Sequence, residues 1–310
     1  MYELGELEAI LSPDGRAFLL GDGAARAVLS VGGRGAPPIE YHTVRGYRQA
    51  SETVVAWTPR PRTLSLTLAW TVSSRSEYWA ARARLMNALR PNQGGPLRLR
   101  HIRPDGTQRE IQAYPDSTPV FDDESAWETL EERLTFTCYD PTFYDPTPRT
   151  LTFTAALQPY LAFPLAFPIS FGDGLRLGDE VSVTYEGDWP AWPVIQASGP
   201  YTWLRLVNRT TGAVVKLGQP LGAGETRTLD LTPGRQSLTD GHGVSRFDEL
   251  VLPDSDLTAF NLRPAGQPWG DSPYEGVPGG VNVLRVEAAG QVVGQTGVTI
   301  TYHPRYLSVG

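Results

Sequence analysis

The chain has 310 residues, of which 40% are hydrophobic and 20% are charged, and it contains 32 glycines and 27 prolines. This composition is typical of a folded protein with frequent turns and argues against long disordered tracts, while the length favours two domains. The formal net charge of -7 argues against a global basic field of the kind that binds nucleic acid.

The first part of the chain shows the pattern of short strands and tight turns. Residues 6–20 predict two strands joined at Pro13-Asp14-Gly15, because proline presets the turn and glycine accepts a positive φ. The same device recurs at Pro104-Asp105-Gly106. Between these hairpins, residues 63–70 alternate strictly, so we expect Leu64, Leu66, Leu68 and Trp70 to share one buried face.

One segment breaks the strand pattern. Residues 74–90 are rich in helix formers, and Ser74 with Glu77 three positions later fits a capping box. We expect the buried stripe of this helix to hold Tyr78, Ala81, Leu85 and Leu89, flanked by Trp79 and Met86. This is the only long helix that the sequence predicts.

A strand over residues 132–139 runs into two aromatic-Asp-Pro units. Leu134, Phe136 and Cys138 alternate to one face of this strand. Proline holds the residue before it in extended geometry and cannot donate to a sheet, so the pairs Asp140-Pro141 and Asp145-Pro146 predict a stiff domain hinge. We therefore divide the chain into domains of residues 1–148 and 149–310.

The second half predicts short strands and almost no helix. The candidate strands are residues 151–155, 181–186, 194–198, 203–208, 214–217 and 281–288. Tandem strands without helices indicate a β-sandwich. The predicted fold class is therefore mainly β, with two sandwich-like or barrel-like domains, the first of which carries the helix.

Motifs for metal or catalytic chemistry are absent from the sequence. Cys138 is the single cysteine, which excludes an intrachain disulfide framework and a cysteine-based zinc site. The four histidines lack metal-ligand spacing, and no nucleophile elbow or H-E-x-x-H motif occurs. With no secretion signal and no apolar run long enough to span a membrane, we expect no cofactor, no metal, no catalytic residue and no membrane insertion.

The order of these pieces resembles the distal tail protein family of long, non-contractile-tailed bacteriophages. The first half is similar to that family's N-terminal ring domain, with a helix that ends at Leu-Arg-Pro-Asn and a strand that runs into Phe136-Thr137-Cys138-Tyr139-Asp140-Pro141. The second half is similar to its galectin-like sandwich, in three recurring pieces: residues 187–193, 208–212 and 278–282. Residues 231–278, rich in Asp, Gly and Pro, depart from the family pattern.

The resemblance implies a structural virion protein and not an enzyme. Such proteins form a homo-hexameric ring at the far end of the tail tube, at the tail tip or baseplate, and are made in the host bacterial cytoplasm. The ring contacts the tail tube protein on one side and a tail hub, tip or receptor-binding protein on the other. DNA passes through it without sequence-specific binding. The tail tube protein itself fits less well, because the second domain is large.

Segregated charge fits a self-associating chain. Residues 1–120 carry a net +4, residues 121–148 carry -7, and residues 149–310 carry -4. In a cyclic, heterologous ring we predict that arginines of residues 75–109 meet the acidic segment 121–132 of a neighbour, or that this acidic segment lines the channel. The candidate residues are Arg82, Arg84, Arg98, Arg100, Asp122, Asp123 and Glu124.

Two functions from other classes stay open. Aromatic faces can stack on sugar rings, so a carbohydrate-binding module that uses Trp189, Trp192 and Trp269, with Trp203 and Tyr201 nearby, is the first alternative. A glycoside hydrolase, which needs two carboxyl groups across a cleft, is the second and weaker one. Burial in the core and in loop packing is the structural explanation that competes with the sugar-binding use of these aromatic residues.

Overall fold

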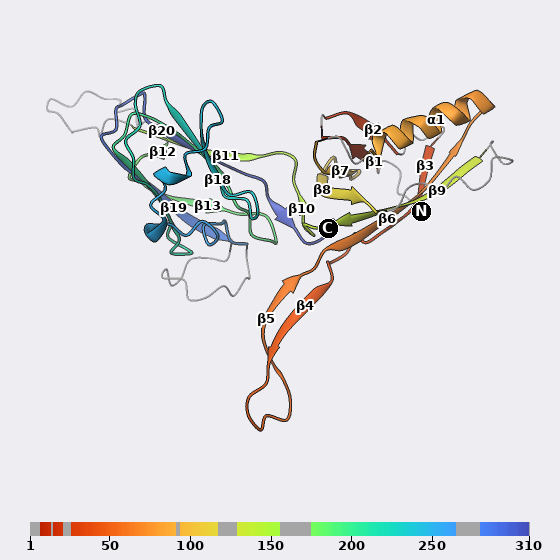
Figure 1. Cartoon of the computed structure of the whole chain (residues 1–310), viewed down its shortest axis with the longest axis horizontal. Coiled ribbons are helices and arrows are strands. Elements are labelled where there is room, and N and C mark those ends of the chain that lie inside the picture. The colour runs from red at the N-terminus through yellow and green to blue at the C-terminus, as the bar shows by residue number, and fades with distance from the viewer. Residues whose placement is uncertain are drawn as a thin grey trace. The chain divides into compact units, whose positions relative to one another are not determined.

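The structure is a computed structural model that describes residues 7–13, 15–20, 26–90, 94–116, 129–155, 175–264 and 280–309. Contacts divide the chain into two compact units, Met1–Pro146 with Tyr306–Gly310, and Thr147–Arg305. The chain therefore passes between the units twice, and its last residues return to the first unit (Figure 1).

The first unit is a strongly paired β structure with one helix. Its main sheet has the strand order β2-β1-β7-β8-β9-β6-β3, and the short β10 pairs with β8 and with β21. The elements are β1 (Leu7–Leu11), β2 (Ala17–Leu19), β3 (Arg26–Gly32), β4 (Ile39–Val44), β5 (Thr53–Pro59), β6 (Arg62–Thr71), α1 (Arg75–Ala88), β7 (Leu97–Ile102), β8 (Gln108–Pro115), β9 (Thr129–Cys138), β10 (Phe143–Tyr144) and β21 (Arg305–Tyr306).

Both Pro-Asp-Gly segments join antiparallel strands, as predicted. β1 pairs with β2, and β7 pairs with β8 in a register that sets Arg100 opposite Glu110. Gly106 has φ +82°, a conformation that a side chain disfavours. The strict alternation of β6 is confirmed, because Leu64, Leu66, Leu68 and Trp70 are all buried.

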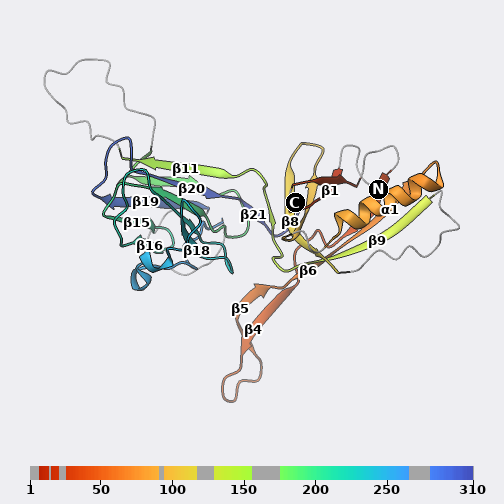
Figure 2. The same cartoon turned by 45° about the horizontal axis from the view of Figure 1, so that its top comes forward.

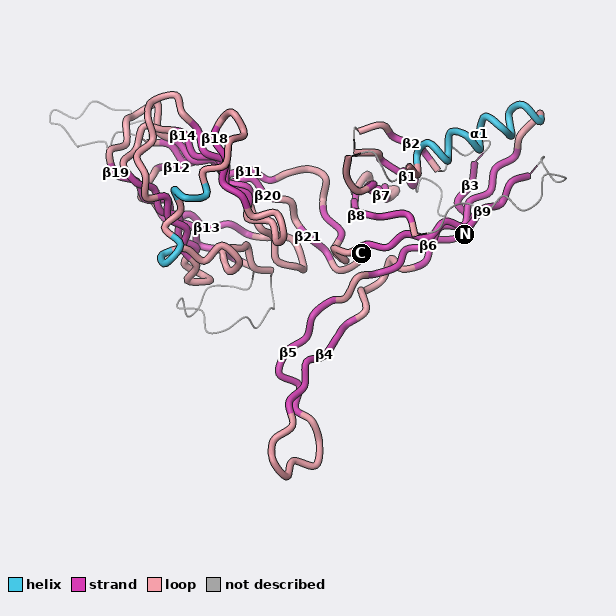
Figure 3. The backbone as a smooth tube through the Cα atoms, viewed as in Figure 1, coloured by secondary structure: helices cyan, strands magenta, loops and turns pink. Residues whose placement is uncertain are grey.

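Helix α1 is the one α-helix among the described residues (Figure 3). Ser74 is its N-cap and accepts a hydrogen bond from the Glu77 main-chain N–H at 3.2 Å. The capping box is modified, since the Glu77 carboxylate accepts from Ser73 and not from the N-cap residue. Tyr78 and Leu85 are buried against the sheet, whereas Trp79, predicted to flank the stripe, is 44% exposed.

The second unit is a β-sandwich of two facing sheets. One sheet has the order β12-β11-β20-β14-β17-β18, and the other has the order β13-β19-β15-β16. The elements are β11 (Arg149–Thr154), β12 (Leu175–Arg176), β13 (Glu180–Thr184), β14 (Val194–Ser198), β15 (Trp203–Asn208), β16 (Val214–Leu217), β17 (Thr226–Asp230), β18 (Ser237–Asp240), the 3-10 helices η2 (Phe247–Glu249) and η3 (Leu252–Asp254), β19 (Val281–Ala289) and β20 (Gly297–Tyr302).

Alternate residues of the two sheets meet in one core. Phe153, Ile195 and Ile300 come from one sheet, and Leu206 and Val286 come from the other; all five are at most 2% exposed. Strands β14, β15 and β16 have the predicted bounds, and β17, β18 and β20 are additional strands. The mainly-β prediction is confirmed.

The Asp-, Gly- and Pro-rich segment that begins at Leu231 is described by the structure as far as residue 264. It forms β18, η2 and η3, and part of it lies along the edge of β16, where the Val251 N–H donates to the Lys216 carbonyl. Within the described ranges, no helix has the length and apolar character needed to cross a membrane, and no group of three or more metal-ligating side chains forms a metal site.

Candidate assembly surface

Strands β4 and β5 form a hairpin that joins no other sheet of the described residues. They pair antiparallel from Ile39 opposite Pro59 to Val44 opposite Thr53, with a bulge after His42. Two views show the hairpin extending away from the main sheet of its own unit (Figures 1 and 2). A two-stranded hairpin by itself is at best marginally stable in water, so contact with another molecule would stabilise this hairpin.

The two faces of the hairpin differ sharply in chemistry. Antiparallel pairing sets Ile39 with Pro59 and Tyr41 with Trp57 on one face. Ile39, Tyr41 and Trp57 are 44%, 61% and 39% exposed, respectively. Beyond the bulge the hairpin carries further exposed apolar side chains, Val44, Val54 and Val55. A cluster of exposed apolar side chains such as Ile39, Tyr41 and Trp57 marks an interaction site.

The opposite face is polar and satisfied within the hairpin. His42 hydrogen-bonds to the Thr58 hydroxyl at 3.1 Å, and Arg60 donates to Glu40 at 3.0 Å. The hydrogen bond from Arg60 holds the pKa of the Glu40 carboxyl below its usual range. The Glu40–Arg60 pair and His42 thus lie opposite the Ile39, Tyr41 and Trp57 side chains, which remain exposed for a contact with another molecule.

The turn between the two strands is held by its own hydrogen bonds. The Gln49 side chain accepts from the Gly46 N–H at 2.9 Å and donates to the Thr53 hydroxyl at 2.7 Å, and Arg45 donates to the Gln49 carbonyl. Tyr47 is 93% exposed at this tip. An ordered tip loses less conformational freedom when it binds a partner.

The sequence patterns singled out above do not include this hairpin. A signal was present, because residues 39–44 and 53–59 are rich in β-branched and aromatic residues and are separated by a segment that contains Gly46. The pattern predicts strands, but no local rule says that both faces stay uncovered.

The candidate arginines fall into two groups. Arg98 and Arg100 of β7 reach the buried Glu110 of β8, at 3.1 and 2.6 Å, so they are already paired within the chain. Arg84 lies exposed on α1, and Arg82 on the same helix lies over the Trp79 ring, 5.1 Å from its centroid. Two of the four arginines are thus engaged with Glu110 within the chain, and the other two lie on α1.

The remaining candidates are divided between the described and the undescribed parts of the chain. Asp122, Asp123, Glu124 and Trp269 lie outside the described residues. Trp192 is partly buried against the sandwich core, and its indole N–H donates to the Thr258 carbonyl at 2.8 Å. Trp189 is half-buried, and the Tyr185 hydroxyl donates to its carbonyl. Trp192 is thus engaged with the sandwich core, and Trp189 is held through its main chain.

The Asp-Pro segment is fixed to the first unit by side-chain contacts. Asp140 accepts from the Thr142 N–H and hydroxyl at 3.2 and 2.8 Å, which closes an Asx turn around Pro141. The Tyr144 hydroxyl donates to Glu110 at 3.1 Å, and burial raises the pKa of this tyrosine above its usual value. The chain leaves the first unit after Pro146, directly beyond Asp145.

The residues that return to the first unit are clamped by arginines. Arg62 is buried and donates to the carbonyls of Leu307 and Gly35, at 2.5 and 2.8 Å. Arg103 donates to the Val309 carbonyl, and the Arg109 guanidinium lies 3.7 Å from the centroid of the Tyr306 ring. Both crossings between the units are therefore anchored at their ends in the first unit.

Comparison with known proteins finds the same fold in phage tail components. No family model and no curated protein matches the chain. Among solved structures, the SPP1 Dit (gp 19.1) protein, a paradigm of the hub adsorption apparatus in phages that infect Gram-positive bacteria, is similar over 96% of this chain and 98% of its own. The identity is 14% and the TM-score is 0.61.

A second phage shows the same likeness. The baseplate of phage P2 in its activated conformation with calcium matches with a TM-score of 0.53, at 9% identity, over 96% of this chain and 97% of that one. The same baseplate with strontium gives a TM-score of 0.52, also at 9% identity. At such identities the likeness shows a shared fold, and it extends over both units of this chain.

Proposed function

We propose that the chain is a structural component of a bacteriophage tail tip or baseplate. In this function copies of the first unit form a homo-hexameric ring that continues the tail tube, and the galectin-like second unit serves attachment to host-recognition proteins. DNA passes through the ring during ejection. The function is non-enzymatic, and its location is the virion tail.

The observation that carries the proposal is the exposed apolar face of the β4–β5 hairpin. Its aromatic and aliphatic side chains gain free energy only when another molecule covers them. A neighbouring copy is the occupant that we propose, because a hairpin face that meets a different face of the next subunit generates a closed ring when the rotation closes. The likeness to tail hub and baseplate proteins over nearly the whole chain supports this choice.

The charge pairing that the sequence suggests is a second part of the proposal. Arg98 and Arg100 already have Glu110, so the intersubunit cations that we propose are those of α1, including the exposed Arg84. Their proposed partners are Asp122, Asp123 and Glu124 of the adjacent copy. Reversal of these three acidic charges should weaken assembly, and an unchanged ring would remove this contact from the proposal.

The central test is mass photometry and electron microscopy of the purified chain, alone and with the tail tube and hub proteins of the same phage. We expect rings of six copies. The double variant Tyr41→Ser/Trp57→Ser should give monomers, since loss of two interface aromatics costs about 2 kcal/mol or more each. The matched control is Trp203→Ala, which removes an exposed tryptophan of the second unit.

Two results would contradict the proposal. One is a chain that stays monomeric with and without its partner proteins. The other is a double variant that still forms the ring, which would exclude the hairpin as the interface. Circular dichroism of the double variant should match the unaltered chain, because neither Tyr41 nor Trp57 belongs to the buried core of the unit.

A further inference from the structure

The second unit carries an open groove that has no part in the proposed ring. Its volume is about 770 Å³, and its floor is the outer face of strands β19, β15 and β16. The segment around η3 forms one wall. A volume of this size lies within the range of about 300–1,000 Å³ that small-molecule sites occupy. The polar lining residues are Trp203, Arg205, Lys216, Asp254, Asp256 and Glu287.

The wall is fixed to the edge of β16 by main-chain hydrogen bonds. Val251 donates to the Lys216 carbonyl at 3.0 Å, and Asp256 donates to the Val214 carbonyl at 2.7 Å. Between them the Ser255 hydroxyl accepts from the Lys216 N–H at 3.0 Å. This segment comes from the part of the sequence that departs from the family pattern. These hydrogen bonds hold the segment in place as one side of the groove.

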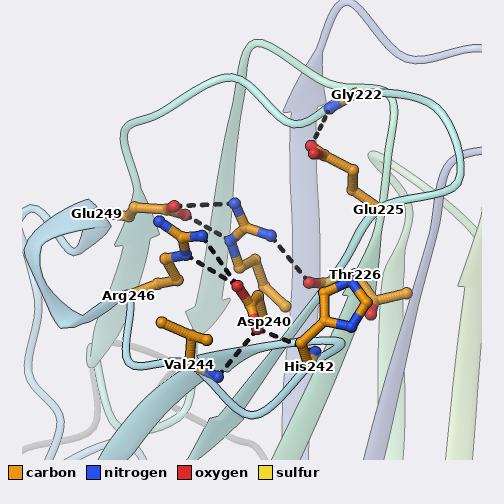
Figure 4. A network of polar contacts seen from close by, with 9 residues as sticks. Gly222, Glu225, Thr226, Asp240, His242, Val244, Arg246 and Glu249 are labelled. Carbon is orange, nitrogen blue, oxygen red and sulfur yellow. Dashed lines mark hydrogen bonds and ion pairs between the residues drawn. The ribbon is translucent and has the colours of Figure 1, made fainter.

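A polar network fixes the beginning of the wall. Arg227 of β17 donates to both oxygens of Glu249, at 2.7 and 2.9 Å, and the Glu249 main-chain carbonyl accepts from Gly218 on the floor. Beside this pair, Arg246 donates to Asp240 at 2.9 Å (Figure 4). The Arg227 and Glu249 side chains are 9% and 13% exposed. Bidentate pairing at this burial gives the wall a defined position before any ligand binds.

Charged side chains form a row across the floor of the groove. The strand register sets Glu287, Arg205 and Lys216 side by side on β19, β15 and β16. Arg205 lies 3.3 Å from Glu287, and Lys216 lies 2.7 Å from Asp254 on the wall. Each cation thus already has a carboxylate, and the groove presents alternating donors and acceptors with no strong net field.

Trp203 adds an accessible aromatic surface beside this row. It precedes Arg205 by two residues on the same face of β15 and is 36% exposed. The residues beside Trp203 on the neighbouring strands are small. Ala289 of β19 pairs with Trp203, and on the other side Gly218 comes directly after Leu217, the partner of Leu204. Gly218 leaves room on the floor for the Val251 side chain of the wall, so the indole ring lies at a groove with both apolar and polar lining.

We propose that this groove binds a neutral oligosaccharide. The apolar C–H face of a pyranose ring stacks on the Trp203 indole, and ring hydroxyls donate to the carboxylates and accept from Arg205 and Lys216. A charged ligand would have to compete with ion pairs that are already formed. A sugar hydroxyl can bind the free lone pairs of the carboxylates and the free N–H groups of the cations without breaking these ion pairs. The site differs from the alternative based on Trp189 and Trp192, neither of which lines this groove.

The test uses the full chain and an array of neutral oligosaccharides that includes lactose, cellotriose, maltotriose and chitotriose. Binders are then measured by isothermal titration calorimetry. Trp203→Ala should weaken binding by about tenfold or more, as the loss of a central aromatic anchor does. Lys216→Met, which keeps the length of the side chain but loses its donors, should weaken binding as well. Trp57→Ser, on the hairpin, should leave binding unchanged.

Lys216 offers a second readout because it is the only lysine of the chain. Acylation with an amine-reactive ester, followed by peptide mass spectrometry, reports the accessibility of this one side chain, with the α-amino group as internal reference. A bound oligosaccharide should slow acylation of Lys216 and leave the reference rate unchanged.

The outcomes separate this proposal from the ring. Ring formation without binding to any array member overturns the glycan site alone, and binding by a chain that stays monomeric overturns the ring alone. Binding that Trp203→Ala leaves unchanged overturns the assignment to this groove. A tail protein that binds the groove in a Trp203-dependent manner, with no oligosaccharide binding, assigns the groove to a protein partner and also overturns the proposal.

Discussion

Replacement of Glu110 by glutamine should destabilise the first unit. The Glu110 side chain has no exposed surface, and it accepts hydrogen bonds from Arg98, Arg100 and Tyr144 at 3.1, 2.6 and 3.1 Å. Glutamine keeps the shape but removes the negative charge, and its amide group presents donors where the arginines also donate. The variant therefore leaves two guanidinium groups without their counter-ion.

The magnitude follows from how much of each partner stays in water. Removal of one partner of a fully buried ion pair costs about 3–5 kcal/mol. The Arg98 and Arg100 side chains are 34% and 29% exposed, so they recover part of their hydration when the carboxylate is lost. We therefore expect a loss of about 2–3 kcal/mol in the free energy of unfolding of this unit.

The assay must resolve the two units, because a chain of two units need not unfold in one step. Hydrogen exchange of the β7 and β8 amides, followed by mass spectrometry at increasing urea, reports the opening free energy of these strands. The matched control is Glu131→Gln on β9, an exposed glutamate that should change stability by less than about 0.5 kcal/mol. A Glu110→Gln loss no larger than that of the control, or one confined to the second unit, would refute the reasoning.

Three further predictions concern single side chains. Tyr78→Phe should stabilise the first unit by about 1 kcal/mol in urea denaturation, because it removes a buried hydroxyl that has no hydrogen-bond partner; a loss of stability would contradict this. Gly33→Ala should cost about 2 kcal/mol or more, since Gly33 has φ +86° and an added Cβ would lie 2.2 Å from a backbone oxygen; Gly94→Ala, strained but with open space around it, should cost less. Hydrogen bonds from the main chain of Val244 and of His242, and then from the Arg246 side chain, lower the pKa of Asp240. Its stabilising effect is therefore full above the unfolded pKa of about 3.9 and is lost as the pH falls through the lower folded pKa. Proteolysis of the loop after β18 should thus accelerate in acid, and Asp240→Asn should flatten this pH dependence; equal pH profiles would contradict the assignment.

Local patterns predicted the elements well where one face of an element is buried. The alternation in β6 and β9 identified the buried residues of both strands, and the Ser74 cap identified the start of α1. The Pro-Asp-Gly turns indicate the register of the strands as well as the position of the hairpins. A tight turn at residues 104–106 fixes the β7–β8 register, so the pairing of Arg100 with Glu110 could have been counted from the sequence.

Contacts between distant parts of the chain had no local signal. Arg62 binds the carbonyl of Leu307 across 245 positions, and nothing in the sequence near either residue indicates it. The same holds for the groove, whose floor comes from β15, β16 and β19 and whose wall comes from residues 251–256. Trp203 was a candidate as an aromatic residue, but only the strand pairing brings Arg205, Lys216 and Glu287 beside it.

The amino-acid sequence by itself determined the strand-rich fold class and the helix with its cap, and it predicts a stiff exit at Asp140-Pro141 and Asp145-Pro146. These features depend on the covalent geometry of proline and glycine and on the side-chain period of each element, which are properties of short segments. Only the tertiary structure decided which charges pair within the chain, which apolar hairpin face stays uncovered, and which residues line the groove. Those outcomes depend on which strands pair, and strand pairing depends on how the apolar side chains of the whole chain are buried together in the core.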